Sequence, residues 1–521
     1  MILGFGGFMP GFAKRLAKEN SWQIAIRDEK DSLKWSEVDE TLNQVTNRLL
    51  NMDLGRERRV AIFAENSVET GLAHLGGLLA GASTVPVNFH LTAEETAYIL
   101  KDSDTKVLFL GSETAQRGLE AAKQAGVSEV VIWGDTEKSE TEFETWKDWL
   151  AQSSKEDPTT DIKPLPHLLY TSGTTGRPKG TDLPPTMFAG GETVAEHIEA
   201  LQGSRYAKFG THLVIGPMYH TGPLSGMRNL VAGVPLVVLG KFDAEKTLSA
   251  IENYEVETTV MVPTHFVRLL DLEDEVRNKY DMSSLKMVTH TGSACPIDVK
   301  SAMIDWWGPV LYEAYGASEV GTTCAITSEE WLKHPGSVGR TRPPFEALVT
   351  DEEGKPVSAG VEGRLYFRDH TGRGVVYHND PEKSAAAHLE PGVFTLGEIG
   401  YLDDEGYVYI TDRFSDMIVS GGVNIYPAES EQVLITHTGV VDVACIGIPD
   451  KEMGERLLAL VIKSKSEVDA TEEDLISYCR EKLTHYKCPS SVEFVEDLGR
   501  TTMGKINKRR LRAPYWESST N

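Results

Sequence analysis

A repeated alternation of short β-branched runs with segments of helical periodicity constrains the fold of this chain most strongly. Arg59–Phe63 is typical of a strand, and Val68–Ala80 is typical of a helix rich in small residues. The alternation recurs in further strands predicted at Lys106–Leu110, Glu129–Trp133, Leu213–Ile215, Leu236–Leu239 and Thr258–Val262, and in a helix predicted at Ala244–Asn253. Strands separated by helices favour largely parallel sheets. We therefore predict an α/β fold with mostly parallel sheets flanked by helices.

The pattern changes near Glu362. Short strands of a small β-rich subdomain are predicted at Gly363–Phe367 and Tyr407–Thr411. Beyond Arg413 the pattern predicts a helix at Asn424–Val433, strands at Asp442–Ile448 and Leu457–Ile462, and a helix at Glu472–Leu483. A chain of 521 residues exceeds the size at which one hydrophobic core stops growing. We therefore predict a large domain over residues 1–413, a boundary at 414–416 and a small α+β domain over 417–521.

Composition excludes several classes of protein. The formal net charge of −26 disfavours binding to nucleic acids or anionic membranes. The five cysteines are odd in number and no pair has CxxC spacing, so we expect reduced thiols in a cytoplasmic protein. Met1–Pro10 is apolar, but its cations follow the apolar run, which is the wrong order for a secretory signal. No run is long enough to span a membrane. The oligomeric state stays open, with a homodimer as one option.

The most informative segment is Thr171–Gly180, TSGTTGRPKG, which follows the apolar run Leu168–Tyr170. Its three glycines let backbone amides turn toward an anion, and its four hydroxyl groups and two cations add donors. The GxxxxGK[ST] pattern of P-loop proteins is absent, because Gly176 is followed by Arg-Pro-Lys. The composition predicts a polyphosphate-binding loop, and a solvated linker is the alternative.

Other short motifs lie in order along the chain: PMYHTG at Pro217–Gly222, GSA at Gly292–Ala294, YGASE at Tyr315–Glu319, GVFTLGEIGYLD at Gly392–Asp403, GGVNIYPAESE at Gly421–Glu431 and RTTMGKI at Arg500–Ile506. Together with Tyr170–Gly180 they resemble the signatures of the adenylate-forming (AMP-binding) superfamily, over a span from about Lys34 to Arg512. The form GGVNIYPAE is most similar to fatty-acyl and related CoA ligases. The resemblance implies that the large domain binds ATP and an acid, and that the small domain is mobile and carries a catalytic lysine.

The resemblance implies a nucleotide site. Its phosphate-binding residues would be Thr171, Ser172, Gly173, Thr174, Thr175, Gly176 and Lys179. The turn of Gly292, Ser293 and Ala294 would form one side of the adenine site, and Tyr315, followed by Gly316, would stack on the base. Ser318 would reach phosphate or carboxylate oxygens. Glu319 would bind Mg²⁺ as a hard oxygen ligand.

The remaining implied roles include departures from the family's pattern. Glu398 stands where an aspartate usually binds the ribose hydroxyls; it can still accept two hydrogen bonds, with a longer reach. Arg413 would be the second ribose contact, or else an ordinary ion-pair partner of Asp412. Ser415 occupies the hinge position, where relatives often have Lys or Asp. Gly421 and Gly422 would line the pantetheine channel. Lys505 would bridge the carboxylate and the α-phosphate.

The acid pocket is the least specified part. His220 would lie beside the acid's carboxylate or act as a gate, and a core histidine is the alternative. A helix over Thr186–Leu201 would line the pocket, with Phe188, Gly190, Gly191 and Val194 forming a small, apolar surface suited to a large ligand. Tyr366–Asp380 resembles the corresponding segment of CoA ligases for long-chain and steroid side-chain acids. Thr181–Pro185, TDLPP, departs from the family's usual residues.

The resemblance thus predicts an ATP-dependent acyl-CoA synthetase. The acid's carboxylate would attack the α-phosphorus of ATP and release pyrophosphate, and the small domain would then rotate so that coenzyme A can take the acyl group. ATP, Mg²⁺ and coenzyme A are the predicted cofactors, and a small-molecule carboxylic acid is the predicted partner. Two alternatives remain open: an acyl-adenylate enzyme with another acceptor, such as a carrier protein or O₂, and a non-catalytic nucleotide-binding relative.

Overall fold

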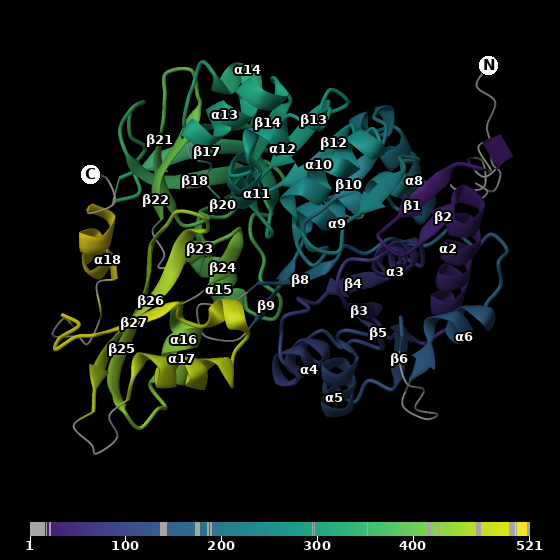
Figure 1. Cartoon of the computed structure of the whole chain (residues 1–521), viewed down its shortest axis with the longest axis horizontal. Coiled ribbons are helices and arrows are strands. Elements are labelled where there is room, and N and C mark those ends of the chain that lie inside the picture. Colours follow the sequence, from purple (N-terminus) through teal and green to yellow (C-terminus); the bar gives the residue numbers. More distant parts are fainter. Residues whose placement is uncertain are drawn as a thin grey trace.

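The computed structural model of the chain describes residues 16, 18–19, 22–135, 143–171, 178–184, 187, 190–293, 295, 297–351, 353–413, 418–425, 427–464, 470–499, 506 and 508–517. It is a mixed α/β structure with a large sheet-based part and a smaller part built from residues after 417 (Figure 1). The predicted fold class is confirmed. No helix within the described residues is both long enough and apolar enough to cross a membrane.

One sheet of the large part is entirely parallel, in the order β4–β3–β5–β6–β7. Its strands are β3 (Arg59–Phe63), β4 (Ser83–Pro86), β5 (Val107–Gly111), β6 (Glu129–Trp133) and β7 (Glu144–Thr145). Its surrounding helices are α2 (Trp35–Leu50), α3 (Val68–Leu79), α4 (Ala93–Asp102), α5 (Ala115–Ala125) and α6 (Trp146–Ala151). All five residues of β3 are buried, because both faces of this sheet are covered by helices. The predictions for β3 and β6 match residue for residue.

A second sheet has fifteen strands. They are β1 (Ile24–Arg27), β2 (Ser32–Lys34), β10 (His212–Val214), β11 (Leu236–Val238), β12 (Thr258–Met261), β13 (Met287–His290), β14 (Leu311–Ala317), β15 (Gly321–Thr327), β16 (Ser337–Thr341), β17 (Phe345–Thr350), β18 (Gly363–Asp369), β19 (His388–Glu390), β20 (Val393–Phe394), β21 (Glu398–Leu402) and β22 (Val408–Arg413). Neighbouring strands are parallel along the order β1–β11–β10–β12–β13–β14. They are antiparallel along β14–β15–β16–β22. The β-rich layer therefore begins near Gly321, earlier than the predicted break at Glu362.

The helices associated with this sheet are α8 (Val194–Gln202), α9 (Thr221–Met227), α10 (Ala244–Asn253), α11 (Pro263–Leu270), α12 (Asp274–Arg277), α13 (Ile297–Trp307), α14 (Ser328–Trp331) and α15 (Pro381–Ala386), with the short 3₁₀ helices η1 (Arg205–Lys208) and η2 (Arg228–Leu230). The principal core packs α10, α11 and α13 on β10–β14 through residues such as Leu248, Phe266 and Met303. A separate hairpin joins β8 (Leu168–Thr171) to β9 (Lys179–Asp182). The sequence pattern predicted only the first of these two strands.

The small part is an independent sheet in the order β24–β23–β26–β25, with β27 added to β26. Its elements are β23 (Ile418–Ser420), β24 (Val423–Ile425), α16 (Pro427–Leu434), β25 (Val440–Asp450), β26 (Gly454–Lys463), α17 (Glu472–Arg480), η3 (His485–Lys487), β27 (Ser491–Phe494) and α18 (Lys508–Glu517). In Figure 1 this small part lies beside the large part, and its helices α16 and α17 are level with the lower half of the large part. The predicted helix start at Asn424 is wrong. Asn424 lies in β24, which pairs with β23 through the Gly421–Gly422 turn, and the helix begins at Pro427.

Candidate active site

A cavity of about 1560 Å³ lies between the large and small parts. Part of its wall comes from segments that follow parallel strands: residues 88–90 after β4, residues 215–217 and 219–222 after β10, Val262 after β12 and residues 291–292 after β13. The small part contributes Gly421, Gly422, Val423, Met453 and Tyr486. Ligands of open α/β sheets bind at the carboxyl ends of strands, so the cavity has the position expected of an active site.

The end of β14 brings three predicted residues to the cavity: Gly316, Ser318 and Glu319. Position 316 accepts only glycine, because a Cβ atom there would lie 1.9 Å from the carbonyl oxygen of Gly321 on β15. Ser318 is held by a 3.1 Å hydrogen bond between its Oγ and that of Thr221 on α9. The YGASE segment therefore presents a hydroxyl and a carboxylate from a closely packed strand end.

Glu319 lies beside a cation that the sequence pattern did not identify. Burial raises the pKa of the Glu319 carboxyl, while the charge of Lys383 and a hydrogen bond from Tyr377 lower it. Lys383 lies on α15, lines the cavity and has its Nζ 3.8 Å from the centre of the Tyr377 ring. No local motif marks Lys383, because its role depends on where α15 packs.

Glu319 fits the kind of metal site expected for a nucleotide-bound cation. Mg²⁺ usually takes one or two carboxylates and completes its shell with phosphate oxygens and water. The described residues hold no cluster of three or more His, Cys, Asp or Glu side chains that could bind a metal by themselves. Glu319 as a single carboxylate ligand is therefore consistent with a cation that arrives with its nucleotide.

The β8–β9 hairpin frames the predicted phosphate loop. Thr171 ends β8 opposite Lys179 of β9. Ser172, Gly173, Thr174, Thr175, Gly176 and Arg177 lie outside the described residues. Lys179 Nζ lies 2.9 Å from Asp380 Oδ2 at the N-terminus of α15. Two cations are therefore linked to the short helix α15: Lys179, which pairs with its N-terminal residue, and Lys383, which lies on it beside Glu319.

Asp182, within the departure at Thr181–Pro185, has a structural role. Asp182 Oδ1 lies 3.0 Å from His378 Nδ1, and the backbone N–H of Asp182 donates to the carbonyl of Val376 at 3.1 Å. The hydrogen bond to Asp182 raises the pKa of His378. Burial opposes ionisation of Asp182, but His378, together with the charges of Arg59 and Arg373, outweighs burial and lowers the pKa of Asp182 below its usual value. This pair anchors the hairpin to the segment before α15.

Of the residues predicted to bind adenine and ribose, some line the cavity and others do not. Gly292 lines the cavity with φ +91°, a conformation that favours glycine. Ser293 and Tyr315 are not among the lining residues, and the Tyr315 ring packs 6.1 Å from that of Phe367. Glu398 lines the cavity, is buried and lies opposite Arg413 in the β21–β22 register. The side chain of Arg413, and Ala294, Ser415 and Lys505, lie outside the described part of the chain.

His220 lies in the cavity wall at the N-terminus of α9. Burial and the neighbouring charge of His90 lower the pKa of His220 to about 4. The imidazole is therefore neutral at pH 7, so it can position an acid's carboxylate by hydrogen bonding without forming an ion pair.

The acid side of the cavity is more polar than predicted. Gly190 and the α8 residues His197, Ala200 and Leu201 line it, but Val194 is fully buried in the core and Gly191 is not a lining residue. Phe188 is not among the described residues. Arg228 on η2 also lines the cavity, and burial lowers its pKa to about 10. The predicted small, apolar surface is therefore only part of the wall.

Two regions of the chain match the two domains of one enzyme family. Residues 12–375 match the AMP-binding enzyme family, and residues 429–505 match the AMP-binding enzyme C-terminal domain. The chain belongs to the AMP-binding enzyme family.

This AMP-binding enzyme is similar to the 3-[(3aS,4S,7aS)-7a-methyl-1,5-dioxo-octahydro-1H-inden-4-yl]propanoyl:CoA ligase of Rhodococcus jostii (strain RHA1). The two are 31% identical over 523 residues, which cover 96% of this chain and 98% of that ligase. The predicted superfamily, its acyl-CoA ligase branch and the reaction class, an AMP-forming acid–thiol ligase, are confirmed.

Solved structures share the fold. The amide bond synthetase McbA from Marinactinospora thermotolerans superposes with a TM-score of 0.81 at 24% identity, covering 97% of this chain and 99% of that one. The o-succinylbenzoate CoA synthetase of Bacillus subtilis, 23% identical over 96% of this chain and 98% of that one, appears in two complexes. A double mutant bound to a product analogue gives a TM-score of 0.76, and the complex with an acyl-adenylate intermediate gives 0.61. The TM-score is thus higher for the product-analogue complex.

Proposed function

We propose that this AMP-binding enzyme is an ATP-dependent acyl-CoA synthetase. It activates a carboxylic acid as an acyl-adenylate with release of pyrophosphate and then transfers the acyl group to coenzyme A. The observation that carries the proposal is the composition of one cavity wall, which combines Ser318, Glu319 and His220 with Glu398 and the small-domain glycines. A nucleotide, an acid and a thiol could all reach such a cavity.

In the first step the acid's carboxylate attacks the α-phosphorus of ATP, and the bond to pyrophosphate breaks. Both reactants are anions, so the protein must screen charge and fix their geometry. Thr171–Gly180 and Lys179 would hold the leaving pyrophosphate, Glu398 and Arg413 would bind the ribose hydroxyls, and Lys505 would stabilise the developing charge. Mg²⁺ held by Glu319 would neutralise phosphate charge. His220 would orient the carboxylate through its neutral ring.

In the second step the thiol of coenzyme A attacks the acyl carbonyl and AMP leaves. We propose that the small domain over 417–521 turns about a hinge at 414–416, Ser415 included, between the steps. In the described arrangement Gly421 and Gly422 line the cavity, and a Cβ atom on Gly422 would lie 3.1 Å from Val262 Cγ1. Ile506, next to Lys505, packs with the small domain's own core and does not line the cavity. This arrangement suits thioester formation.

The acid is proposed to be large and to carry a ring system of the steroid-derived type. The cavity is roomy, and its acid side combines apolar Leu201 and Ala232 with the polar side chains of His197 and Arg228. A guanidinium whose pKa is about 10 is still cationic at pH 7 and could donate to a ring carbonyl. The acid named for the Rhodococcus ligase is a bicyclic propanoate with two such carbonyls. A long-chain acid is the less favoured choice, since its tail would bring no polar group to either of these side chains.

Pyrophosphate release measured over a panel of acids, with and without coenzyme A, tests the proposal. We expect release that depends on a bulky ring-bearing acid, and an acyl-CoA product when coenzyme A is present. Acid-dependent release without any acyl-CoA product would favour another acceptor, such as a carrier protein. No release with any acid would contradict the synthetase function.

A further inference from the structure

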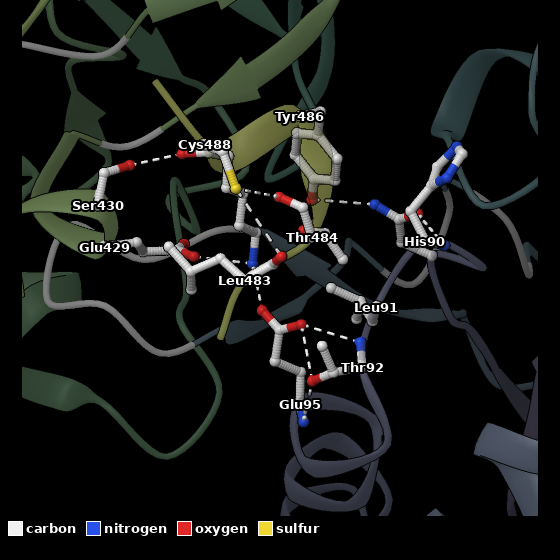
Figure 2. Close-up of polar contacts among 12 residues, drawn as sticks. His90, Leu91, Thr92, Glu95, Glu429, Ser430, Leu483, Thr484, Tyr486 and Cys488 are labelled. Atoms are coloured by element: carbon white, nitrogen blue, oxygen red, sulfur yellow. Dashed lines mark hydrogen bonds and ion pairs between the residues drawn. The ribbon is translucent and has the colours of Figure 1, made fainter. Parts of the chain in front are cut away.

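A buried lysine of the small domain is shared by one carboxylate from each domain. Lys487, at the end of η3, is 2% exposed. Its Nζ lies 2.7 Å from Glu429 Oε2 on α16 and 2.8 Å from Glu95 Oε1 on α4 of the large domain. Figure 2 shows Glu429 reaching this point from the left and Glu95 reaching it from below. We call Glu95, Glu429 and Lys487 the domain latch.

The small-domain half of the latch is fixed without help from the large domain. The hydroxyl of Ser430 donates to the backbone carbonyl of Lys487 at 2.6 Å, and the Lys487 N–H donates to the carbonyl of Thr484 at 2.9 Å. Burial raises the pKa of Glu429, and the nearby ammonium of Lys487 lowers it. Because Lys487 and Glu429 belong to the same domain, this pair would persist in any orientation of that domain.

The large-domain half depends on a single side chain with two functions. Glu95 Oε2 accepts hydrogen bonds from the backbone N–H and the hydroxyl of Thr92, at 3.0 and 3.1 Å, and so caps α4. Glu95 Oε1 accepts a hydrogen bond from the Lys487 ammonium. The chain just before Thr92 includes Asn88, whose Nδ2 donates to the Tyr486 hydroxyl at 3.0 Å. Asn88 and Tyr486 both line the cavity, so the latch lies directly behind its wall.

Within the part of the chain that the structure describes, the other ion pair between the domains is weak by comparison. Arg268 Nε lies 2.8 Å from Glu452 Oε1, but the two side chains are 41% and 54% exposed. Exposed pairs are screened by water and contribute little. The pair of Lys487 with Glu95, in contrast, has side chains that are 2% and 15% exposed, so water and salt screen it much less. Of these two contacts, the latch is therefore the one better able to discriminate between domain orientations.

We propose that Glu95 is a positioning residue for thioester formation. Its carboxylate captures the Lys487 ammonium and so holds the small domain in the orientation that brings Gly421 and Gly422 to the cavity. This inference rests on the proposed two-step function and deepens it by naming the contact that selects the second step. When the domain turns for adenylate formation, Glu95 becomes hydrated and Lys487 keeps Glu429, so no buried charge is left alone.

The substitution Glu95→Gln tests the proposal with little risk to folding. Glutamine is accepted at the same capping position and keeps an oxygen for Thr92. With that oxygen on Thr92, the amide NH₂ faces Lys487, so the ammonium loses both the negative charge and the acceptor that Oε1 provides. The matched control is Glu94→Gln, the same change on the exposed neighbouring residue of the same helix turn. Adenylate formation is measured as acid-dependent pyrophosphate release without coenzyme A, and thioester formation as acyl-CoA produced from supplied acyl-adenylate.

We expect Glu95→Gln to slow thioester formation by about tenfold, the change expected for losing a hydrogen bond to a charged group, with adenylate formation changed less than about twofold. Glu94→Gln should match the unmodified enzyme in both steps. Equal slowing of both steps, or no slowing of either, would overturn the positioning role. In a double-mutant cycle the effects of Glu95→Gln and Lys487→Met on thioester formation should be non-additive; additive effects would also overturn it. If the unmodified enzyme releases no pyrophosphate with any acid, the proposed function itself fails, and the latch role with it.

Discussion

The substitution Gly316→Ala gives the sharpest prediction from the geometry of the site. The added Cβ atom would lie 1.9 Å from the carbonyl oxygen of Gly321, whereas ordinary contacts begin at 3.4 Å. The backbone of β15 would have to move away by about 1.5 Å. Overpacking of this kind destabilises a protein by about 1–3 kcal/mol. Ser318 and Glu319 lie two and three residues further along, and a displacement of about 1 Å at reacting groups lowers rates by about 10²-fold.

Two measurements check this prediction. Acid-dependent pyrophosphate release should fall by about 10²-fold, and thermal unfolding should show a lower midpoint. The control is Gly203→Ala, whose new Cβ atom would lie 3.4 Å from its nearest neighbour, the carbonyl oxygen of Glu199, and whose φ is −81°. It should leave both quantities nearly unchanged. Full activity and an unchanged midpoint for Gly316→Ala would refute the argument that the closely packed strand end positions the catalytic groups.

Three further predictions concern other parts of the molecule. Glu319→Gln should lower pyrophosphate release by about 10²-fold and shift its Mg²⁺ dependence to higher concentration; an unchanged Mg²⁺ titration would argue against a metal role. The raised pKa of His378 means that its pairing with Asp182 stabilises the fold fully below the ordinary imidazole pKa of about 6.5, and that this contribution is lost as pH rises through the raised value. The melting-temperature deficit of His378→Gln should therefore be larger at about pH 6 than at about pH 9, and a deficit that grows with pH would contradict the assignment. Lys300→Met should destabilise the enzyme by about 3–5 kcal/mol in urea unfolding, because the Lys300 ammonium lies 2.5 Å from buried Glu313; a loss under about 1 kcal/mol would show that Glu313 finds another partner.

The sequence predicted the parallel part of the fold well, because buried parallel strands are continuous β-branched runs. Arg59–Phe63 and Glu129–Trp133 match β3 and β6 for this reason. It placed the antiparallel layer too late, since β15, GTTCAIT, carries no strong alternation and directly follows the YGASE motif. It also missed β9, whose residues pair with β8 across a glycine-rich loop. Such pairings depend on tertiary contacts more than on local preference.

The candidate site was predictable where a motif carries the chemistry and unpredictable where distant segments meet. Ser318, Glu319, His220, Glu398, Gly421 and Gly422 were identified from motifs, and all of them line the cavity. Lys383 and the domain latch had no sequence signal. Glu95 and Lys487 are 392 residues apart, and each is locally indistinguishable from a surface charge. The roles of Lys505, Ser415 and the loop at 172–177 stay predictions, because these residues lie outside the described part of the chain.

The central claim is that two half-reactions share one cavity and require different orientations of the small domain. Comparing both half-reactions in Lys505→Ala with those of the unmodified enzyme tests it most directly. The account predicts that adenylate formation from acid and ATP is abolished, while acyl-CoA formation from supplied acyl-adenylate continues at close to the normal rate, because Lys505 would stabilise charge only in the first step. An equal loss of both half-reactions would contradict the account.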